Sequence, residues 1–374
     1  MSDLKYNLAD IETPALILDE QKMIKNIHRI MKVKDNNVQV RPHFKTHKSI
    51  EIAKKQLELG ACGITVATVS EAEVLLHGGV RDILIAFPLV DKRKIERLLQ
   101  WSNARIIFTV DSKEQSQIIE GIAIQLGVTP EVWIKVNSGL NRCGVEPGLE
   151  AVELIKEIST RNIVNATGIY THAGHSYAAT SQEMINKIAK EEAESVLQSA
   201  QLCEEAGFAI LHKSVGSTPT FELASKYDGI TEVRPGNAVF FDGIQVSLGV
   251  ANLEEVALTV LTSVSSIKSN RFIIDGGSKA LTTERGAHGN ENIKGYGRLL
   301  LDPPLFVTRV SEEHGIIAME VEHEEIVKNI SLNKKLHVVP NHACPVVNLY
   351  DYYYVKKEEG IYEKVCIDGR GKSQ

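Results

Sequence analysis

The sequence predicts an α/β protein in which a TIM-like (βα)8 barrel is followed by a smaller, β-rich domain. Two observations support this prediction. Short apolar runs rich in β-branched residues alternate with stretches of helical spacing in the first 250 residues, which is the pattern of βα units around a parallel sheet. Beyond that point helical patterns become rare and strand-like runs dominate.

Eight apolar runs are the predicted strands of the barrel. They cover residues 37–41, 63–67, 82–87, 104–110, 131–136, 167–171, 211–215 and 232–234. Helical patterns lie between them, among others at 49–60, 70–79, 92–100, 112–127 and 147–160. Several of these patterns begin at Ser or Asp and end at Gly, as capped helices do. Eight such units indicate a (βα)8 barrel.

The predicted domain limits follow from this change of pattern. We expect the barrel to occupy residues 15–250 and the β-rich domain residues 251–374, with residues 1–14 associated with the β-rich domain. Strand-like runs in the second part cover residues 256–268, 271–281, 305–321, 335–349 and 352–370.

The composition excludes several classes of protein. The chain has 374 residues, 43% of them hydrophobic and 24% charged, with a formal net charge of −6, so a polyanionic partner such as nucleic acid is not expected. No signal peptide and no membrane-spanning apolar stretch is recognisable, so we expect a cytoplasmic protein without membrane partners. The five cysteines are odd in number and scattered, which argues against a disulfide framework.

Polar residues gather just after the predicted strands. In (βα)8 barrels the loops after the strands meet at one mouth, where active sites lie. The residues at these positions are His43 and Lys45 after the first strand, 137–142 after the fifth, His172 and His175 after the sixth, 216–220 after the seventh and 234–237 after the eighth.

Two of these segments suggest a phosphate-bearing aldehyde cofactor. In the GSTPT turn at 216–220, successive backbone N–H groups and hydroxyls can point at an anion, although flavins, nucleotides or phosphosugars would be bound equally well. Lys45 at the same mouth can form an imine with an aldehyde. The alternative is that RPHFKTHKS, residues 41–49, is a basic loop for an anionic substrate.

Motifs along nearly the whole chain resemble those of one family. They are TPALILD, RPHFKTHKS, VNSGLNRCG, GIYTHAGHSY, SVGSTPT, EVRPGNAVFFD, IDGGSKAL, SEEHG and PNHACPVVNLYD, in this order. In this combination they resemble the D-threonine aldolase and D-serine dehydratase family of fold-type III enzymes, which use pyridoxal 5′-phosphate (PLP) and are relatives of alanine racemase.

The resemblance implies roles for individual residues. Lys45, rather than Lys48, would carry PLP as a Schiff base. The remaining cofactor-binding residues implied by the resemblance are Arg142, Tyr177, Gly216, Ser217, Thr218, Arg234, Gly236 and Asn237. One departure from the family pattern is Asn137, where relatives often have Asp, which leaves Arg142 without one expected partner.

His342 and Cys344 are the candidate metal ligands. On an extended segment, residues two apart point to the same side, so an imidazole and a thiolate can bind one ion while water or substrate completes the site. The thiolate favours Zn²⁺, although Mn²⁺ or Mg²⁺ is also possible. The alternative is a buried structural cysteine beside a packed histidine.

The His-x-Cys pair resembles the dehydratases of the family. We therefore expect a small β-hydroxy D-amino acid of the D-serine or D-threonine type to be deaminated to a 2-keto acid and ammonia. In the alternative, a D-threonine aldolase, the metal would acidify the β-hydroxyl and His172 or His175 would accept its proton.

Two further alternatives stay open. A racemase needs a second base, for which the candidates are Tyr296, Tyr350, Tyr352, Tyr353 and Tyr354. A non-catalytic PLP carrier would have no use for a metal pair.

The resemblance also implies a homodimer. His314 is interpreted either as support for the metal or as a turn residue, and Asp275 with Lys279 as a salt bridge between domains.

Overall fold

The computed structural model describes residues 5–286, 293–319, 329–357 and 360–374. The chain divides into two compact units. One comprises residues 28–45, 52–236 and 372–374 and is called the barrel unit; the other comprises residues 1–27, 46–51 and 237–371 and is called the β unit. These units are not continuous in the sequence. The predicted domain limits, 15–250 and 251–374, describe continuous segments and stay a prediction.

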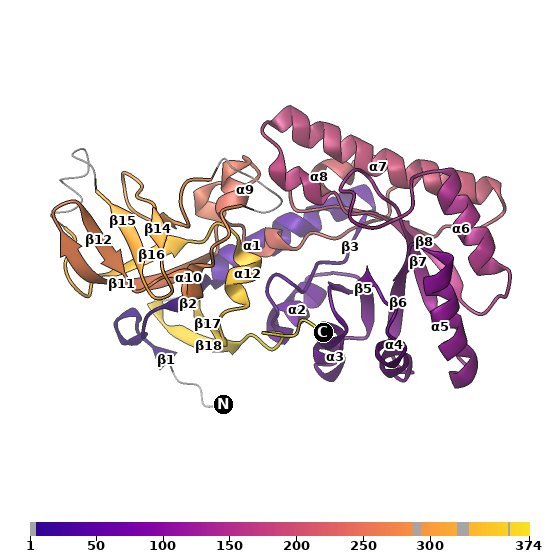
Figure 1. Cartoon of the computed structure of the whole chain (residues 1–374), viewed down its shortest axis with the longest axis horizontal. Helices are drawn as coiled ribbons and strands as arrows, with labels where there is room; N and C mark the ends of the chain where they lie inside the picture. The colour runs from indigo at the N-terminus through magenta and orange to yellow at the C-terminus, as the bar shows by residue number, and fades with distance from the viewer. Residues whose placement is uncertain (1–4, 287–292, 320–328, 358–359) are drawn as a thin grey trace. The chain divides into compact units, whose positions relative to one another are not determined.

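The barrel unit contains a parallel eight-stranded sheet in the order β3-β10-β9-β8-β7-β6-β5-β4. The edge strands β3 and β4 are joined by hydrogen bonds from Phe44 N–H to the Thr65 carbonyl and from Thr65 N–H to the Pro42 carbonyl, which closes the barrel. All eight predicted strands are present, and Figure 1 shows the neighbouring strands β5, β6, β7 and β8. Their bounds are β3 Gln39–Val40, β4 Ile64–Val66, β5 Asp82–Pro88, β6 Arg105–Val110, β7 Glu131–Lys135, β8 Asn165–Tyr170, β9 His212–Val215 and β10 Glu232–Val233.

Helices follow the strands, as βα units require. Two of the predicted helix starts are confirmed, because the side chains of Asp91 and Ser112 accept backbone N–H groups, and Gly127 ends its helix in the left-handed conformation as predicted. The helix expected to begin at Ser70 is capped by Thr68 instead, and Ser181 caps a further helix. The helices are α1 Glu20–Met31, α2 Ile50–Glu58, α3 Val69–His77, α4 Lys92–Leu99, α5 Lys113–Leu126, α6 Leu149–Ser159, α7 Gln182–Glu205 and α8 Phe221–Ala224.

The barrel interior combines an apolar cluster with buried ion pairs. Leu84, Ile107, Trp133 and Tyr170 form one fully buried cluster. Beside it the Arg41 guanidinium, 1% exposed, pairs with the carboxylates of Glu232 and Asp82. Arg41 is thus neutralised inside the barrel, because a buried cation needs such partners.

The β unit contains a mixed sheet that is ten-stranded over the described residues. Its main order is β1-β18-β17-β2-β11-β12-β15-β14, and β16 joins β13 to β11. The strands are β1 Lys5–Tyr6, β2 Ala15–Asp19, β11 Leu258–Lys268, β12 Arg271–Ile274, β13 Arg298–Leu299, β14 Arg309–Val310, β15 Gly315–Ala318, β16 Lys335–Val339, β17 Tyr352–Lys356 and β18 Tyr362–Cys366. Residues 320–321 and 358–359 of the predicted strand-like runs lie outside the described residues.

Short helices interrupt the β unit. They are α9 Gly243–Ser247, α10 Ser278–Leu281 and α12 Ala343–Val347. The N-terminal strand β1 pairs with β18, and β2 lies parallel to β17.

Across the described part of the chain, the model holds no helix with both the length and the apolar character needed to span a bilayer.

Candidate active site

Lys45 follows β3 at the carboxyl end of the barrel strands and is half-buried. Its backbone N–H donates to His43 Nδ1 at 3.3 Å. Lys48 is engaged elsewhere, because its ammonium donates to the Gly369 carbonyl at 3.3 Å within the β unit. Lys45 thus belongs to the barrel unit and Lys48 to the β unit.

His172 follows β8 and is surrounded by positive charge. Burial lowers the pKa of His172 well below its usual value, and the charges of Lys45, Arg142, Arg234 and Lys135 lower it further. The imidazole is therefore neutral at physiological pH. Four cations around one ring also make this end of the barrel suitable for an anionic ligand.

Arg234 is buried against the barrel wall. Its guanidinium donates to Ser214 Oγ at 2.6 Å and to the Thr171 carbonyl, and it lies 4.6 Å from the centroid of the Tyr170 ring. Burial lowers the pKa of Arg234, while Glu232 raises it. These contacts fix the side chain in one position.

The turn after β9 begins at a glycine in the left-handed region, followed by two buried hydroxyl side chains. Gly216 has a φ of +105°, and a Cβ there would lie 3.2 Å from Phe221 Cβ and 3.3 Å from the Arg234 backbone nitrogen. The position thus suits glycine. Ser217 and Thr218 are both buried, with 2% and 1% exposure.

His175 and Tyr177 lie on the 3-10 turn Gly174–Ala178 that follows β8. His175 Nδ1 is buried, and no hydrogen-bond partner for it lies among the described residues. A Cβ on Gly139, which has a φ of +110°, would lie 3.3 Å from His175 Nε2. Burial lowers the pKa of His175. An unpartnered buried nitrogen at this turn is available to a ligand.

Asn137 shapes the loop that carries Arg142. The Asn137 amide donates to Asn141 Oδ1 at 2.8 Å and to Glu146 Oε1 at 2.9 Å, and its oxygen accepts the N–H groups of Gly139 and Asn141. Arg142 itself is exposed, although its charge acts on His172. The Asn at this position therefore organises the loop.

Gly236 and Asn237 follow Arg234 in the chain. Gly236 is half-buried. The Asn237 side chain is buried and its amide donates to Asp242 Oδ2, whereas its Oδ1 has no hydrogen-bond partner. The side chain of Asn237 thus supports Asp242 in the β unit.

His342 and Cys344 meet in the β unit. The two side chains are hydrogen-bonded, and His342 Nδ1 lies 3.1 Å from both carboxylate oxygens of Glu284. Burial lowers the pKa of His342, but Cys344, Glu284 and Asp242 together raise it well above its ordinary value. Cys344 Sγ also lies 3.2 Å from the hydroxyl of Thr46, the residue after Lys45 in the chain.

The local backbone of the pair differs from the extended segment that we expected. His342 is the N-cap residue of α12, in an extended conformation, and Cys344 lies in the first turn of that helix. Asp242 Oδ2 accepts the Ala343 N–H at 2.8 Å and so fixes the segment between the two side chains. No third His, Cys, Asp or Glu joins them in a metal-binding group among the described residues.

Two lesser expectations have clear outcomes. His314 is exposed, and its Nδ1 lies 3.4 Å from Ser311 Oγ, so it is a turn residue. The pairing of Asp275 with Lys279 is wrong. Lys279 forms an ion pair with Glu313, whereas Asp275 accepts hydrogen bonds from Thr13 and Ser263.

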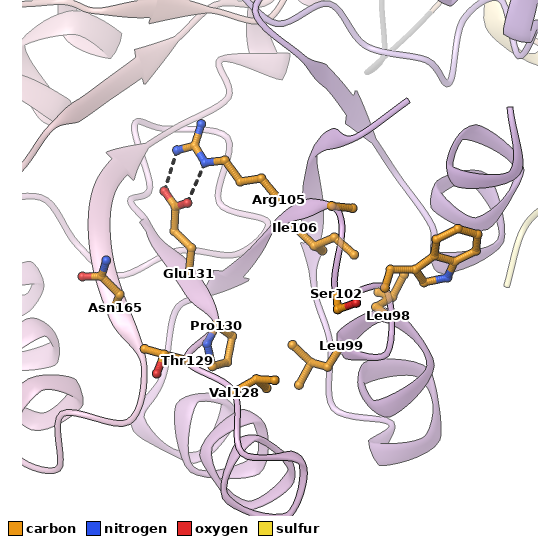
Figure 2. A pocket seen from close by; sticks show the side chains of 12 residues that line it. Leu98, Leu99, Ser102, Arg105, Ile106, Val128, Thr129, Pro130, Glu131 and Asn165 are labelled. Atoms are coloured by element: carbon orange, nitrogen blue, oxygen red, sulfur yellow. Dashed lines mark hydrogen bonds and ion pairs between the residues drawn. The ribbon is translucent and has the colours of Figure 1, made fainter. Parts of the chain in front are cut away.

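A cavity of about 320 Å³ lies away from these residues (Figure 2). Its lining includes Arg105, Glu131 and Asn165, which are the first residues of β6, β7 and β8. The cavity thus lies at the amino ends of the strands, and the Arg105–Glu131 ion pair there is a stabilising contact at 2.7 Å.

Four residues that shape the site are not among those predicted from the sequence. They are Thr46, Glu192, Asp242 and Glu284. Asp242 caps α9 by accepting the Gln245 N–H, and the Asp before this short helix is a signal that could have been recognised. The other three act through partners far away in the sequence, for which no local signal exists.

Comparisons with known proteins agree with this architecture. Residues 18–243 match the family model "Alanine racemase, N-terminal domain", and residues 257–356 match "Putative serine dehydratase domain". The chain is 34% identical to D-threo-3-hydroxyaspartate dehydratase of Delftia sp. (strain HT23), over 96% of this chain and 97% of that protein. It is 30% identical to D-serine dehydratase of Dictyostelium discoideum, over 95% and 96% of the two chains.

Solved structures give the same result. The Delftia dehydratase superposes with a TM-score of 0.90 at 32% identity, covering 96% of this chain and 98% of that one. A D-threonine aldolase from Filomicrobium marinum superposes with a TM-score of 0.90 at 27% identity over 100% of both chains. Variants of the dehydratase have also been solved, with Ala replacing a His or the Cys two positions after it, the latter in a metal-free form. This chain belongs to the alanine racemase-like family of fold-type III PLP enzymes that includes these dehydratases and aldolases.

Proposed function

We propose that this enzyme is a PLP- and metal-dependent lyase that dehydrates a β-hydroxy D-amino acid, of the D-serine or D-threonine type, to a 2-keto acid and ammonia. The observation that carries the proposal is the meeting of His342 and Cys344, with Glu284 behind the imidazole. A paired imidazole and thiol suits a metal ion, and a carboxylate commonly orients such a metal-binding histidine.

The residues at the barrel mouth fit PLP. The glycine at position 216 and the buried Ser217 and Thr218 suit a phosphate, and the unpartnered His175 Nδ1 suits a polar ring substituent. Lys45 lies close enough to His172 for its charge to lower the pKa of that ring. Arg142, Tyr177, Arg234, Gly236 and Asn237 stay proposed cofactor-binding residues.

When bound, PLP supplies an aldehyde for imine formation and an electron sink for charge that develops at Cα. The Lys45 amine is the proposed base for the α-proton. Arg142 and Lys135 add the positive charge that holds anionic groups of the ligands. The neutral His172 stays uncharged beside them and does not repel Lys45.

His342 and Cys344 are the proposed metal ligands. The soft thiolate favours Zn²⁺ over Mn²⁺ or Mg²⁺. A metal there supplies Lewis acidity, which makes a β-hydroxyl a better leaving group. The metal-free form of the Cys-to-Ala variant of the Delftia dehydratase supports this assignment.

The second candidate function is a D-threonine aldolase. It is favoured by the lowered pKa values of His172 and His175, because a neutral imidazole can accept the proton of a β-hydroxyl. The same metal would then acidify that hydroxyl. The structural match to the Filomicrobium aldolase also supports this second candidate.

The racemase alternative is disfavoured by the tyrosines that it needs. The Tyr353 hydroxyl donates to the His47 carbonyl at 2.6 Å, and the Tyr350 hydroxyl to the Ala280 carbonyl at 3.1 Å. Burial raises the pKa of both hydroxyls, so neither is a ready base. Tyr296 contacts Arg285, and Tyr352 and Tyr354 contact Lys364. The carrier alternative leaves the His342–Cys344 pair without a purpose.

A homodimer is the proposed assembly, which light scattering would test. The proposed location is the cytoplasm.

The cofactor assignment is tested with lysine variants. The wild-type protein with added PLP should show visible absorbance of the bound cofactor, Lys45→Ala should lose it, and Lys48→Arg should keep it. Retention of that band by Lys45→Ala would refute Lys45 as the anchor.

The proposed reaction is tested with D-serine, from which we expect pyruvate and ammonia to form. EDTA should abolish this activity, and Zn²⁺ should restore it.

A further inference from the structure

Glu192 is a fully buried acid in the middle of α7. Its Oε1 accepts the Gly216 N–H at 2.6 Å and its Oε2 accepts the Thr220 hydroxyl at 2.6 Å. The Ala173 N–H also donates to it. One carboxylate thus joins the segment after β8 to the turn after β9.

The contacts continue from Glu192 through hydroxyl groups. Thr220 Oγ1 accepts the Ser217 N–H at 3.2 Å and lies 2.9 Å from Ser217 Oγ. Ser217 Oγ lies 2.8 Å from Ser176 Oγ, on the turn between His175 and Tyr177. The Thr220 hydroxyl donates its hydrogen to Glu192, which leaves the Thr220 oxygen to accept the N–H of Ser217.

A buried carboxyl of this kind is costly. The pKa of Glu192 is raised, because burial raises it more than the hydrogen bonds from Thr220, Gly216 and Ala173 and the charge of Arg234 lower it. An apolar residue would fill the same space in the helix at a lower desolvation cost. What the carboxyl adds is two acceptor atoms at the point where the two turns meet.

We propose that Glu192 is a positioning residue for the phosphate site: it holds the 216–220 turn and the Ser217 hydroxyl in the conformation that receives the phosphate of PLP. The inference rests on the proposed function, in which PLP binds at this turn. Because the Gly216 N–H is bonded to Glu192 and the Ser217 N–H to Thr220, the proposal assigns recognition of the phosphate to the Ser217 hydroxyl and to Thr218.

The test is a titration of the full-length apoprotein with PLP and, separately, with pyridoxal, which lacks the phosphate. Glu192→Gln keeps the size but has one acceptor oxygen in place of two. Thr220→Val removes the linking hydroxyl and Thr220→Ser restores it. Glu194→Gln, on the same helix in an exposed ion pair with Lys190, is the matched control. The readout is the visible absorbance of the bound ligand.

Glu192→Gln and Thr220→Val should raise the Kd for PLP by about tenfold, the effect of losing one hydrogen bond, and leave that for pyridoxal unchanged. Thr220→Ser and Glu194→Gln should bind PLP as the wild type does. If Glu192→Gln binds PLP with wild-type affinity, or loses affinity for PLP and pyridoxal equally, the role of Glu192 is refuted while the proposed function stands. If Glu192→Gln does not fold, the Thr220 pair decides by the same criteria. A wild-type protein that binds neither ligand would overturn the proposed function as well.

Discussion

Glu284 contacts the imidazole of His342, with both of its carboxylate oxygens 3.1 Å from Nδ1. Because a carboxylate accepts hydrogen bonds, Nδ1 carries a proton, and in the proposed site Nε2 is the nitrogen that would bind a metal after losing its own proton. Carboxylates behind metal-binding histidines commonly fix the tautomer and the orientation of the ring.

Removing the Glu284 carboxylate should weaken metal binding. We expect Glu284→Ala to lower the affinity for Zn²⁺ about tenfold, since the His342 ring loses its fixed orientation. The measurement is metal content after dialysis against graded concentrations of a chelator. Glu313→Ala, which removes an exposed partner of Lys279, is the control. Equal Zn²⁺ retention by Glu284→Ala and the control would contradict this role.

Cys344 should be required for both metal content and dehydration. Cys344→Ala leaves His342 as a single protein ligand, so we expect loss of bound Zn²⁺ and of 2-keto acid formation while the visible absorbance of bound PLP is retained. Cys366→Ala, a half-buried cysteine of the same unit, should keep all three. Full Zn²⁺ content and turnover in Cys344→Ala would refute the metal site.

Acid should destabilise the apoprotein through the half-buried His212. Burial, with help from Arg105, lowers the pKa of His212 below its usual value near 6.5. The unfolded chain therefore takes up a proton that the folded state does not, so the stabilisation is complete above pH 6.5 and is lost as the pH falls toward the folded-state pKa. Urea unfolding at pH 7.5 and 5.5 should show a smaller loss of unfolding free energy in His212→Gln than in the wild type. Identical pH dependence would show that His212 carries no such linkage.

The Arg105–Glu131 ion pair makes a second pH-dependent contribution. Burial raises the pKa of Glu131, but Arg105 and Thr167 lower it to about 2 from 4.5. Stability from this group is present above pH 4.5 and is lost as the pH falls toward 2. After discounting for the 36% exposure of Arg105, Glu131→Gln should cost about 2 kcal/mol at pH 7.

Urea unfolding at pH 7 and pH 3.5 checks that contribution. The cost of Glu131→Gln should shrink at the lower pH. Glu157→Gln, which breaks an ion pair with Lys113 whose side chains are both 49% exposed, should cost less than about 1 kcal/mol. A cost for Glu131→Gln that is as small as that for Glu157→Gln would refute the buried role of the pair.

The sequence predicts the barrel well because periodicity is a local property. Each predicted barrel strand begins and ends within two residues of the observed strand, as with 82–87 and β5 Asp82–Pro88. The site is harder to predict. Cys344 lies on a helix rather than an extended segment, and the N–H of the preceding Ala343 is held by Asp242, 101 residues away from Ala343. Glu284 and Glu192 likewise act on partners 58 and 24 residues away, which no local pattern records.

The central claim is tested most directly by the products formed from D-threonine, which can undergo either proposed reaction. The wild-type protein, supplied with PLP and Zn²⁺, should release 2-ketobutyrate and ammonia in equal amounts, with glycine and acetaldehyde as minor products at most. Glycine and acetaldehyde as the main products would contradict the dehydratase assignment and establish the aldolase.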